Sequence, residues 1–316
     1  MNSQFLTILN NPIIEGFFSA SMRLSIPILL AAIGGVYNER AGLSNIGMEG
    51  IMLFGSLIGF MVSHATGSIW LGILAAILMG IILGLLMGFF EINLMVNQVV
   101  FGIALNLFCL GATSFIYRIA YGIGQSPRIN PLPSFAIPYL SEIPVLGPLF
   151  FNQTIVAYLT YLIVLITAIV FAKTSFGLGI IASGENPQAA ETKGVDVIKT
   201  RYIAIIISGA LCALGGAFLS TNSTGIFVSN MTAGRGYIAL AILVIGRWDP
   251  FGVFATALLF GAADSLQLRT QLLNVSIPYQ FLVMLPYLLC IIVMVLFSKS
   301  SSAPAALGET YQRDNN

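Results

Sequence analysis

The sequence is poor in charged residues, and this scarcity excludes most classes of soluble protein. Of its 316 residues, 8% are charged and 57% are hydrophobic, and the mean hydropathy is +0.94. A soluble protein has roughly a quarter of its residues charged. The net charge is only +1 and no basic cluster occurs, so nothing supports binding to nucleic acid. The composition predicts a polytopic membrane protein.

Residues that build metal and catalytic sites are also rare. The sole histidine, His64, stands at the end of an apolar run without a companion, as an interfacial side chain does. The cysteines, Cys109, Cys212 and Cys290, lie far apart inside apolar runs and are expected to be small buried residues. We therefore expect no metal site and no cofactor bound by this chain. An integral membrane enzyme would need a clustered set of such groups, and none is visible.

Two further patterns are missing. The sequence contains no G-x-x-x-x-G-K-[ST] motif, so any ATP must be used by another polypeptide or domain. Residues 1–11 are polar and lack the positively charged start of a cleavable signal peptide.

Long apolar runs dominate what remains. A helix needs roughly 20 apolar residues to cross the hydrocarbon layer. Runs close to that length or longer cover 13–37, 46–63, 69–90, 94–117, 154–172, 202–221 and 277–297. Two shorter runs, 232–246 and 250–264, fit either short tilted helices or a re-entrant pair. We predict an all-α transmembrane bundle of about nine spans, within a range of about eight to ten.

The chain reads as a single transmembrane domain over 1–300, followed by a polar tail at 301–316 that we expect to be loose or packed on a partner. A proline-rich connection at 121–152 is expected to be stiff and poorly helical. Gly80, Gly84 and Gly88 recur every four residues and predict a close contact between two helix backbones.

A polar loop at about 173–201 interrupts the apolar runs, and its signals predict one short helix. Asn186 can cap that helix and Pro187 suits its first position. Gly194 can end it, and Asp196 can cap the next helix. The short helix would have roughly eight residues and a length of about 12 Å. It could dock a soluble protein or be an ordinary connection, and these residues alone fit both.

The distribution of lysine and arginine predicts the orientation. With nine crossings, a cytoplasmic 173–201 loop places Arg40, Arg247, Lys299 and Arg313 on the same side. Arg118, Arg128, Arg235 and Arg269 fall on the other side. Because cytoplasmic loops carry the excess of basic residues, we expect an external N-terminus and a cytoplasmic C-terminus.

Polar side chains inside the apolar runs are candidates for a translocation path, since burying them in lipid is costly. The candidates are Asn45, Glu49, Asn93, Asn97, Gln98, Asn106 and Asp264. Helical spacing predicts that Asn45 and Glu49 share one face and that Asn93 and Asn97 share another. These side chains could equally form hydrogen bonds that hold helices together, worth about 0.6–2 kcal/mol each. We expect the adjacent Glu39 and Arg40 to pair locally.

Several motifs resemble those of one family. Residues 38–50 (NERAGLSNIGMEG), 97–106 (NQVVFGIALN) and 184–195 (GENPQAAETKGV) resemble permease subunits of bacterial ABC importers. They are similar to the nucleoside-type branch of a group that also carries ribose, other simple sugars and branched-chain amino acids. Residues 246–252 (GRWDPFG), 278–280 (PYQ) and 304–308 (PAALG) agree with that branch.

The resemblance implies a permease subunit of the bacterial plasma membrane that carries nucleosides by alternating access, with ribose or other simple sugars as the alternative. A cytoplasmic ABC ATPase would use ATP and Mg and would press on the polar loop at about 173–201, which we call the coupling loop. The residues implied in this coupling are Gly184, Glu185, Asn186, Pro187, Ala190, Glu191, Lys193 and Gly194. A second permease, paralogous or identical, and an external lipid-anchored solute-binding protein would complete the system.

A secondary transporter driven by ions is the alternative of another class. Glu49 and Asp264 would then carry protons, and the chain would need no ATPase.

Overall fold

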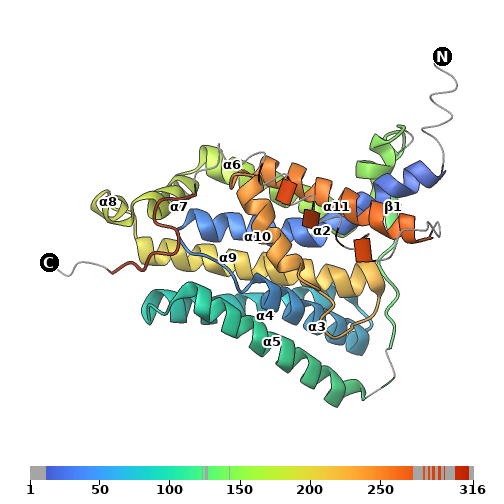
Figure 1. Ribbon diagram of the computed structural model, residues 1–316, viewed down its shortest axis with the longest axis horizontal. Helices are drawn as coiled ribbons and strands as arrows, with labels where there is room; N and C mark the ends of the chain where they lie inside the picture. Colours follow the sequence, from blue (N-terminus) through green and yellow to red (C-terminus); the bar gives the residue numbers. More distant parts are fainter. Residues whose placement is uncertain are drawn as a thin grey trace.

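The computed structural model describes residues 12–122, 124, 127–141, 143–272 and 303–312, together with 280, 281, 284, 287, 288, 291, 292 and 295. The chain forms a helical bundle (Figure 1). Its long helices are α2 (Pro12–Arg40), α3 (Met48–Thr66), α4 (Ile69–Gly88), α5 (Gln98–Tyr121), α6 (Ile155–Lys173), α9 (Val197–Phe218) and α11 (Pro250–Leu272). Shorter helices are α7 (Ser175–Glu185), α8 (Pro187–Thr192) and α10 (Arg235–Ile245), and π-helical turns are η1 (Phe89–Asn93), η2 (Gly147–Phe151) and η3 (Leu219–Thr224).

Seven helices in the described part of the chain are long and apolar enough to cross a membrane, against about nine predicted. The run at 232–246 is the short helix α10, as expected. The prediction that 250–264 is short was wrong, because α11 continues to Leu272. The polar residues Asp264, Gln267 and Gln271 end the apolar run but remain helical. The predicted span 277–297 lies outside the continuously described residues.

Burial separates central from peripheral helices. α9 packs against α2, α3 and α4, and Figure 1 shows it running lengthwise through the bundle. In α3 and α9, 72% of the most apolar window is buried inside the chain, but only 28% in α5 and α6. The outer helix α5 exposes Leu107, Phe108 and Phe115. Such an apolar exterior suits lipid or another membrane subunit.

The glycine pattern of α4 brings two helix backbones together, as predicted. A side chain on Gly80 would overlap the backbone oxygen of Gly209 in α9, and one on Gly209 would overlap the oxygen of Gly80. Gly84 faces the carbonyl of Ile205 in the same way. α4 and α9 therefore cross at a contact that only very small residues allow.

The proline-rich connection adds the only two strands found in the described residues. β1 (Ser134–Ala136) pairs antiparallel with β2 (Asn152–Thr154). The Gln153 side chain is buried between them and the bundle, where its amide donates to the Pro148 carbonyl at 2.9 Å. The fold is therefore helical apart from this small hairpin.

The two ends of the bundle differ. Figure 1 shows α7, α8 and residues 303–312 at one end, with β1 and the start of α2 at the other. We call the first the coupling end. The end of α2 lies there, because Ala306 of the tail bonds to Gly184, and Gly308 bonds to Gly42 just after α2. α4 and α6 run toward this end, and α5, α9 and α11 run away from it.

Candidate functional site

The coupling loop folds as its local signals predict. The Asn186 side chain accepts from the Ala189 N–H at 2.9 Å, and Pro187 takes the first position of α8. Gly194 has φ +88°, and the Asp196 side chain accepts from the Lys199 N–H at 3.1 Å to cap α9. α8 has six residues rather than about eight, because the chain already turns at Lys193 and Gly194.

A second helix of the loop escaped prediction. α7 begins at Ser175, and the side chain of its N-cap Thr174 accepts from the Gly177 N–H at 3.1 Å. Its eleven residues are mostly apolar but too few to span a membrane, so the search for crossing helices passed over them. The Thr174 cap was the available signal.

Not all of the predicted coupling residues face outward. Gln188, Ala189, Thr192 and Lys193 form the exposed side of α8. Ala190 is 4% exposed and packs in a small cluster with Val197 and Tyr311. It therefore holds α8 on the bundle.

Gly184 is also buried, and a Cβ there would overlap the Arg40 carbonyl at the end of α2. Glu185, Asn186, Lys193 and Gly194 are exposed, while Pro187 and Glu191 are half-buried. The coupling loop thus presents one polar side to its surroundings and rests on α2 with the other.

The Glu39 and Arg40 side chains both turn to a distant tryptophan, so the prediction of a local pair was wrong. The Trp248 indole N–H donates to a Glu39 carboxylate oxygen at 2.5 Å. The Arg40 Nε donates to the Trp248 carbonyl at 3.3 Å. Trp248 and Arg247 both have positive φ, in a tight turn between α10 and α11 that sets this geometry.

A polar cluster lies deeper, where α3 and α10 begin. The Glu49 carboxylate accepts from the Gly234 N–H at 2.8 Å and from the Gly236 N–H at 2.7 Å. The first N–H groups of a helix have no partner within it, and its dipole favours negative charge there. Glu49 therefore caps α10 from a different helix.

Asn106 of α5 holds the start of α3 in the same way. Its side-chain oxygen accepts from the Gly50 N–H at 2.8 Å. Its amide donates to the Ile46 carbonyl at 2.8 Å and to the Tyr237 hydroxyl at 2.9 Å. Asn106 thus joins the segment before α3 to α10.

Asn45 and Gln98 also serve the segment before α3. The Asn45 amide donates to the Ser208 hydroxyl at 2.9 Å, and the Ser44 N–H donates to the Gln98 side chain at 2.6 Å. The chain is not helical at Asn45, since α3 begins at Met48. Asn45 and Glu49 therefore do not share a helical face as predicted.

Asn93 and Asn97 lie elsewhere, in the connection between α4 and α5 at the coupling end. The Tyr202 hydroxyl donates to the Asn93 side chain at the end of η1. Asn97 caps α5, accepting from the Val99 and Val100 N–H groups at 3.0 and 3.1 Å. The helix begins at 98 rather than 94, so these asparagines share no face.

Asp264 of α11 is half-buried, and its carboxylate interacts electrostatically with Arg235. Arg235 is the first residue of α10, between the two glycines that Glu49 caps. Arg235 therefore lies in the predicted short run 232–246, at its helical start. Asp264 and Glu49 thus flank the start of α10 from two helices.

The polar cluster has a definite depth. Asn106 lies eight residues along α5, which is about 12 Å from the coupling end. The eleven residues of α10 extend about 16 Å from the cluster to that end. A distance of about 12–16 Å along these helices from one end is compatible with the middle of a hydrocarbon core about 30 Å thick. Broken helices at this depth are typical of transporters.

The cluster's geometry is that of a helix junction rather than a reactive site. Both Glu49 oxygens and both Asn106 side-chain groups already have partners. In the residues that the structure describes, no group of three or more His, Cys, Asp or Glu side chains could hold a metal. The predicted path residues therefore divide into a set at or near the junction and the pair Asn93 and Asn97 at the coupling end.

Reasoning from sequence missed Arg201 and Tyr237. Arg201 is 2% exposed; its Nε donates to the Ala41 carbonyl at 3.1 Å, and its Nη1 to the Glu309 carbonyl at 3.2 Å. Tyr237 is half-exposed beside Asn106. For Arg201, the available signal in the sequence was an arginine directly before a long apolar run.

Comparison with known proteins gives the family. Residues 17–297 match the family described as branched-chain amino acid transport system / permease component. The chain is 37% identical to the guanosine ABC transporter permease protein NupQ of Bacillus subtilis, over 92% of this chain and 95% of that protein. It is 36% identical to the nucleoside ABC transporter permease protein NupC of Lactococcus lactis, over 91% and 93%. No solved structure matches.

The match covers the bundle from α2 onward, and it agrees with the seven helices that could cross a membrane. The chain is therefore a multi-pass permease subunit of an ABC transporter and belongs to the family of branched-chain amino acid transport system permease components.

Proposed function

We propose that this chain is one permease subunit of an ATP-driven nucleoside importer in a bacterial plasma membrane. The supporting observation is the coupling end, where a capped six-residue helix presents Gln188, Ala189 and Lys193 outward while Ala190 fixes it to the bundle. A rigid, exposed helix at a bundle end is suited to receive force from a soluble ATPase. ATP and Mg are used by that ATPase.

The polar cluster supports an alternating-access step. α3 and α10 both begin there, and hydrogen bonds from other helices hold their starts. Discontinuous helices near the middle of a membrane commonly border the solute site of transporters. We propose that the solute passes beside this junction.

The proposed orientation places the coupling end in the cytoplasm. Lysine and arginine residues of that end are Arg40, Lys173, Lys193, Lys199, Arg201 and Arg247. Arg118, Arg128 and Arg269 belong to the other end. Excess basic residues mark the cytoplasmic side.

Labelling tests the orientation. Gln188→Cys and Asn130→Cys, each in a chain without its native cysteines, place one exposed thiol at either end. A membrane-impermeant maleimide should label Asn130→Cys in intact cells, and Gln188→Cys only after permeabilisation. The reverse pattern would overturn the orientation.

A second, non-identical permease is the proposed membrane partner. Lactococcus lactis has two nucleoside ABC transporter permease proteins that resemble this chain, NupC at 36% identity and NupB at 27%. Two such proteins in one organism support a pair of different subunits. An external lipid-anchored solute-binding protein would deliver the solute. Co-purification from native membranes should recover the second permease, the solute-binding protein and the ATPase with this chain.

Glucose or another sugar is the second candidate solute. A protein of Haloferax volcanii, provisionally named a glucose ABC transporter permease protein, is 38% identical over 83% of this chain. The nucleoside relatives cover more of the chain, and this favours nucleosides. Uptake of labelled guanosine by the complete transporter, competed with other nucleosides and with glucose, distinguishes the two.

Coupling is tested in α8. The Ala190 N–H donates to the Asn186 carbonyl at 2.9 Å, so Ala190→Pro removes that bond and disrupts the helix. We expect normal membrane insertion but no uptake and no solute-stimulated ATP hydrolysis. Ala190→Ser keeps the N–H and is the matched control. Normal uptake by the proline variant would overturn the proposal, and uptake driven by an ion gradient without the ATPase would favour a secondary transporter.

A further inference from the structure

The tail packs on its own bundle instead of being loose. We call residues 303–312 the tail segment. The Ala306 N–H donates to the Gly184 carbonyl at 2.8 Å, and the Gly308 N–H donates to the Gly42 carbonyl at 3.0 Å. Tyr311 is buried beside Ala190 of α8. The tail segment therefore bridges the end of α2 and the coupling loop.

Arg201 fixes the far part of the tail segment. Besides donating to the Glu309 carbonyl, its guanidinium lies over the Tyr311 ring, 5.8 Å from the ring centre. Its Nε reaches the Ala41 carbonyl at 3.1 Å. One buried arginine thus joins the tail segment to the end of α2, so the shape of this surface exists before any partner binds.

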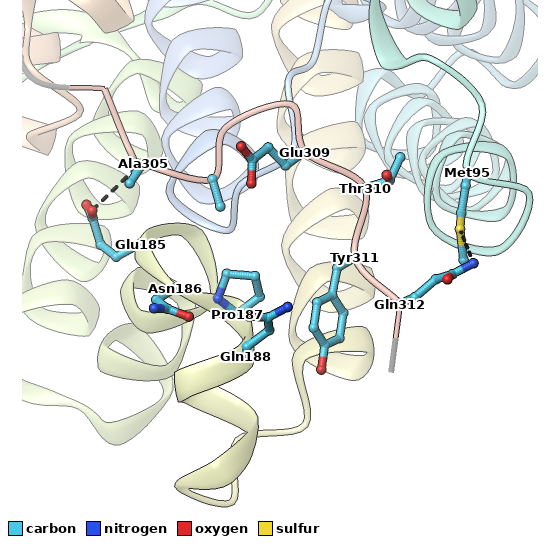
Figure 2. A pocket seen from close by; sticks show the side chains of 11 residues that line it. Met95, Glu185, Asn186, Pro187, Gln188, Ala305, Glu309, Thr310, Tyr311 and Gln312 are labelled. Atoms are coloured by element: carbon cyan, nitrogen blue, oxygen red, sulfur yellow. Dashed lines mark hydrogen bonds between the residues drawn. The ribbon is translucent and has the colours of Figure 1, made fainter. Parts of the chain in front are cut away.

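A polar groove of about 720 Å³ lies between the coupling loop and the tail segment. Figure 2 shows Glu185, Asn186, Pro187 and Gln188 on the coupling-loop side. The tail side is formed by Ala305, Ala306, Glu309, Thr310, Tyr311 and Gln312, with Met95 at one end. A groove of this volume has room for several side chains of another protein.

The charged side chains of the groove are both acidic. Glu185 and Glu309 are exposed, and no lysine or arginine is among the described lining residues. The two nearby arginines lie behind the walls, where Arg40 interacts electrostatically with Glu185 and Arg201 with Glu309. Their hydrogen bonds go to backbone carbonyls and leave the carboxylate oxygens of both glutamates available. The groove therefore offers carboxylates and amide groups to a partner.

The groove continues the exposed side of α8. Gln188 belongs to both surfaces, since it is exposed on α8 and lines the groove. A protein that covers α8 therefore also covers the mouth of the groove. This continuity identifies the occupant as the protein that binds α8, and it disfavours a lipid or a free metabolite.

We propose that the groove binds a lysine- or arginine-bearing segment of the ATPase, so that the tail segment is the second half of the ATPase docking surface. This inference rests on the proposed function, in which α8 contacts the ATPase. Opposite charges across such an interface raise the association rate and fix the register of the partners. A preformed groove lowers the cost of ordering on binding.

Binding of the purified ATPase to the complete permease pair in nanodiscs tests the proposal. Thr310→Trp fills the groove, and Glu309→Lys reverses one of its charges without removing the backbone carbonyl that holds Arg201. Each should raise the Kd about tenfold, equivalent to about 1.4 kcal/mol. Glu309→Lys should also reduce the dependence of the Kd on salt. Asn130→Trp and Asn130→Lys, at the opposite end, are the matched controls and should bind normally.

Ala189→Asp on the exposed side of α8 separates this inference from the proposed function. If Ala189→Asp weakens binding while both groove variants bind normally, the groove proposal is wrong and the α8 contact stands. If none of the three weakens binding, both fail.

Crosslinking gives a readout that does not depend on affinity. Thr310→Cys, in a chain without native cysteines, should join to a lysine of the ATPase through a short maleimide–succinimide reagent. Crosslinks confined to Lys193 or Lys199 of the permease itself would contradict the proposal.

Discussion

Glu49 and Glu91 are two buried carboxylates in opposite situations, and replacing each by glutamine tests the capping role of Glu49. Glu49 is 8% exposed and accepts two backbone N–H groups at the start of α10. Glu91 is 2% exposed, and neither of its oxygens has a hydrogen-bond partner among the described residues. The same substitution should therefore have different effects at the two positions.

The magnitude follows from the hydrogen bonds. Soluble proteins lose about 1.5–3 kcal/mol per hydrogen bond to a charged group, and hydrogen bonds between membrane helices average about 0.6 and reach about 1.7 kcal/mol. Glu49→Ala removes two, so the values for membrane helices give an expected loss of about 1–3.5 kcal/mol. Glu49→Gln keeps one acceptor oxygen and should lose about half as much. Glu91→Gln removes a carboxylate without a described partner and should leave stability unchanged or raise it.

The assay is thermal unfolding of the purified chain in detergent. A change of 1 kcal/mol shifts the midpoint by about 2–4 °C in a protein of 150–250 residues, so the expected shift for Glu49→Gln is a few degrees downward. Glu49→Ala should shift the midpoint further, and Glu91→Gln should not lower it. Equal shifts for the two glutamine variants, or no loss for Glu49→Ala, would refute the capping role.

Three other substitutions test separate parts of the structure. Gly80→Leu should lower the unfolding midpoint by an amount equivalent to at least about 1–3 kcal/mol, because a side chain there overlaps α9, whereas Gly111→Leu meets open space and should be neutral. Arg201→Met should release the tail segment, detected as faster proteolytic cleavage near the C-terminus with the bundle still folded; an unchanged cleavage rate would contradict its anchoring role. Asn106→Ala leaves two backbone groups before and within α3 unpaired and should destabilise by about 1–3 kcal/mol, measured by the same thermal assay; a neutral result would show that the junction does not need this amide.

Features set by neighbours in sequence were predictable. The caps at Asn186 and Asp196, the proline at the start of α8 and the left-handed Gly194 each depend on residues within one helical turn. The glycine spacing of α4 predicted a close helix contact, although the partner helix could not be named. Long apolar runs likewise identified most of the spans.

Features set by distant residues were not predictable from spacing. A buried carboxylate such as Glu49 is a candidate proton carrier by residue type. Its role as a cap, however, depends on the start of α10, 185 residues away in the sequence. The helix starts of α3 and α5 came later than their apolar runs, because nothing in those runs marks where the chain stops being extended. As a result, two pairs of polar residues were assigned to shared helical faces that do not exist.

The segment 38–50 connects the coupling end to the polar cluster. At the coupling end, its Gly42 carbonyl accepts from the tail segment. Ser44 and Asn45 then bond to α5 and α9, and Glu49 reaches α10 in the polar cluster. Packed side chains, hydrogen-bond networks and rigid helices can carry energetic coupling between two sites. Because this short segment is hydrogen-bonded to the tail segment at one end and to α10 at the other, it is a continuous structural link between the coupling end and the discontinuous helices about 12–16 Å away.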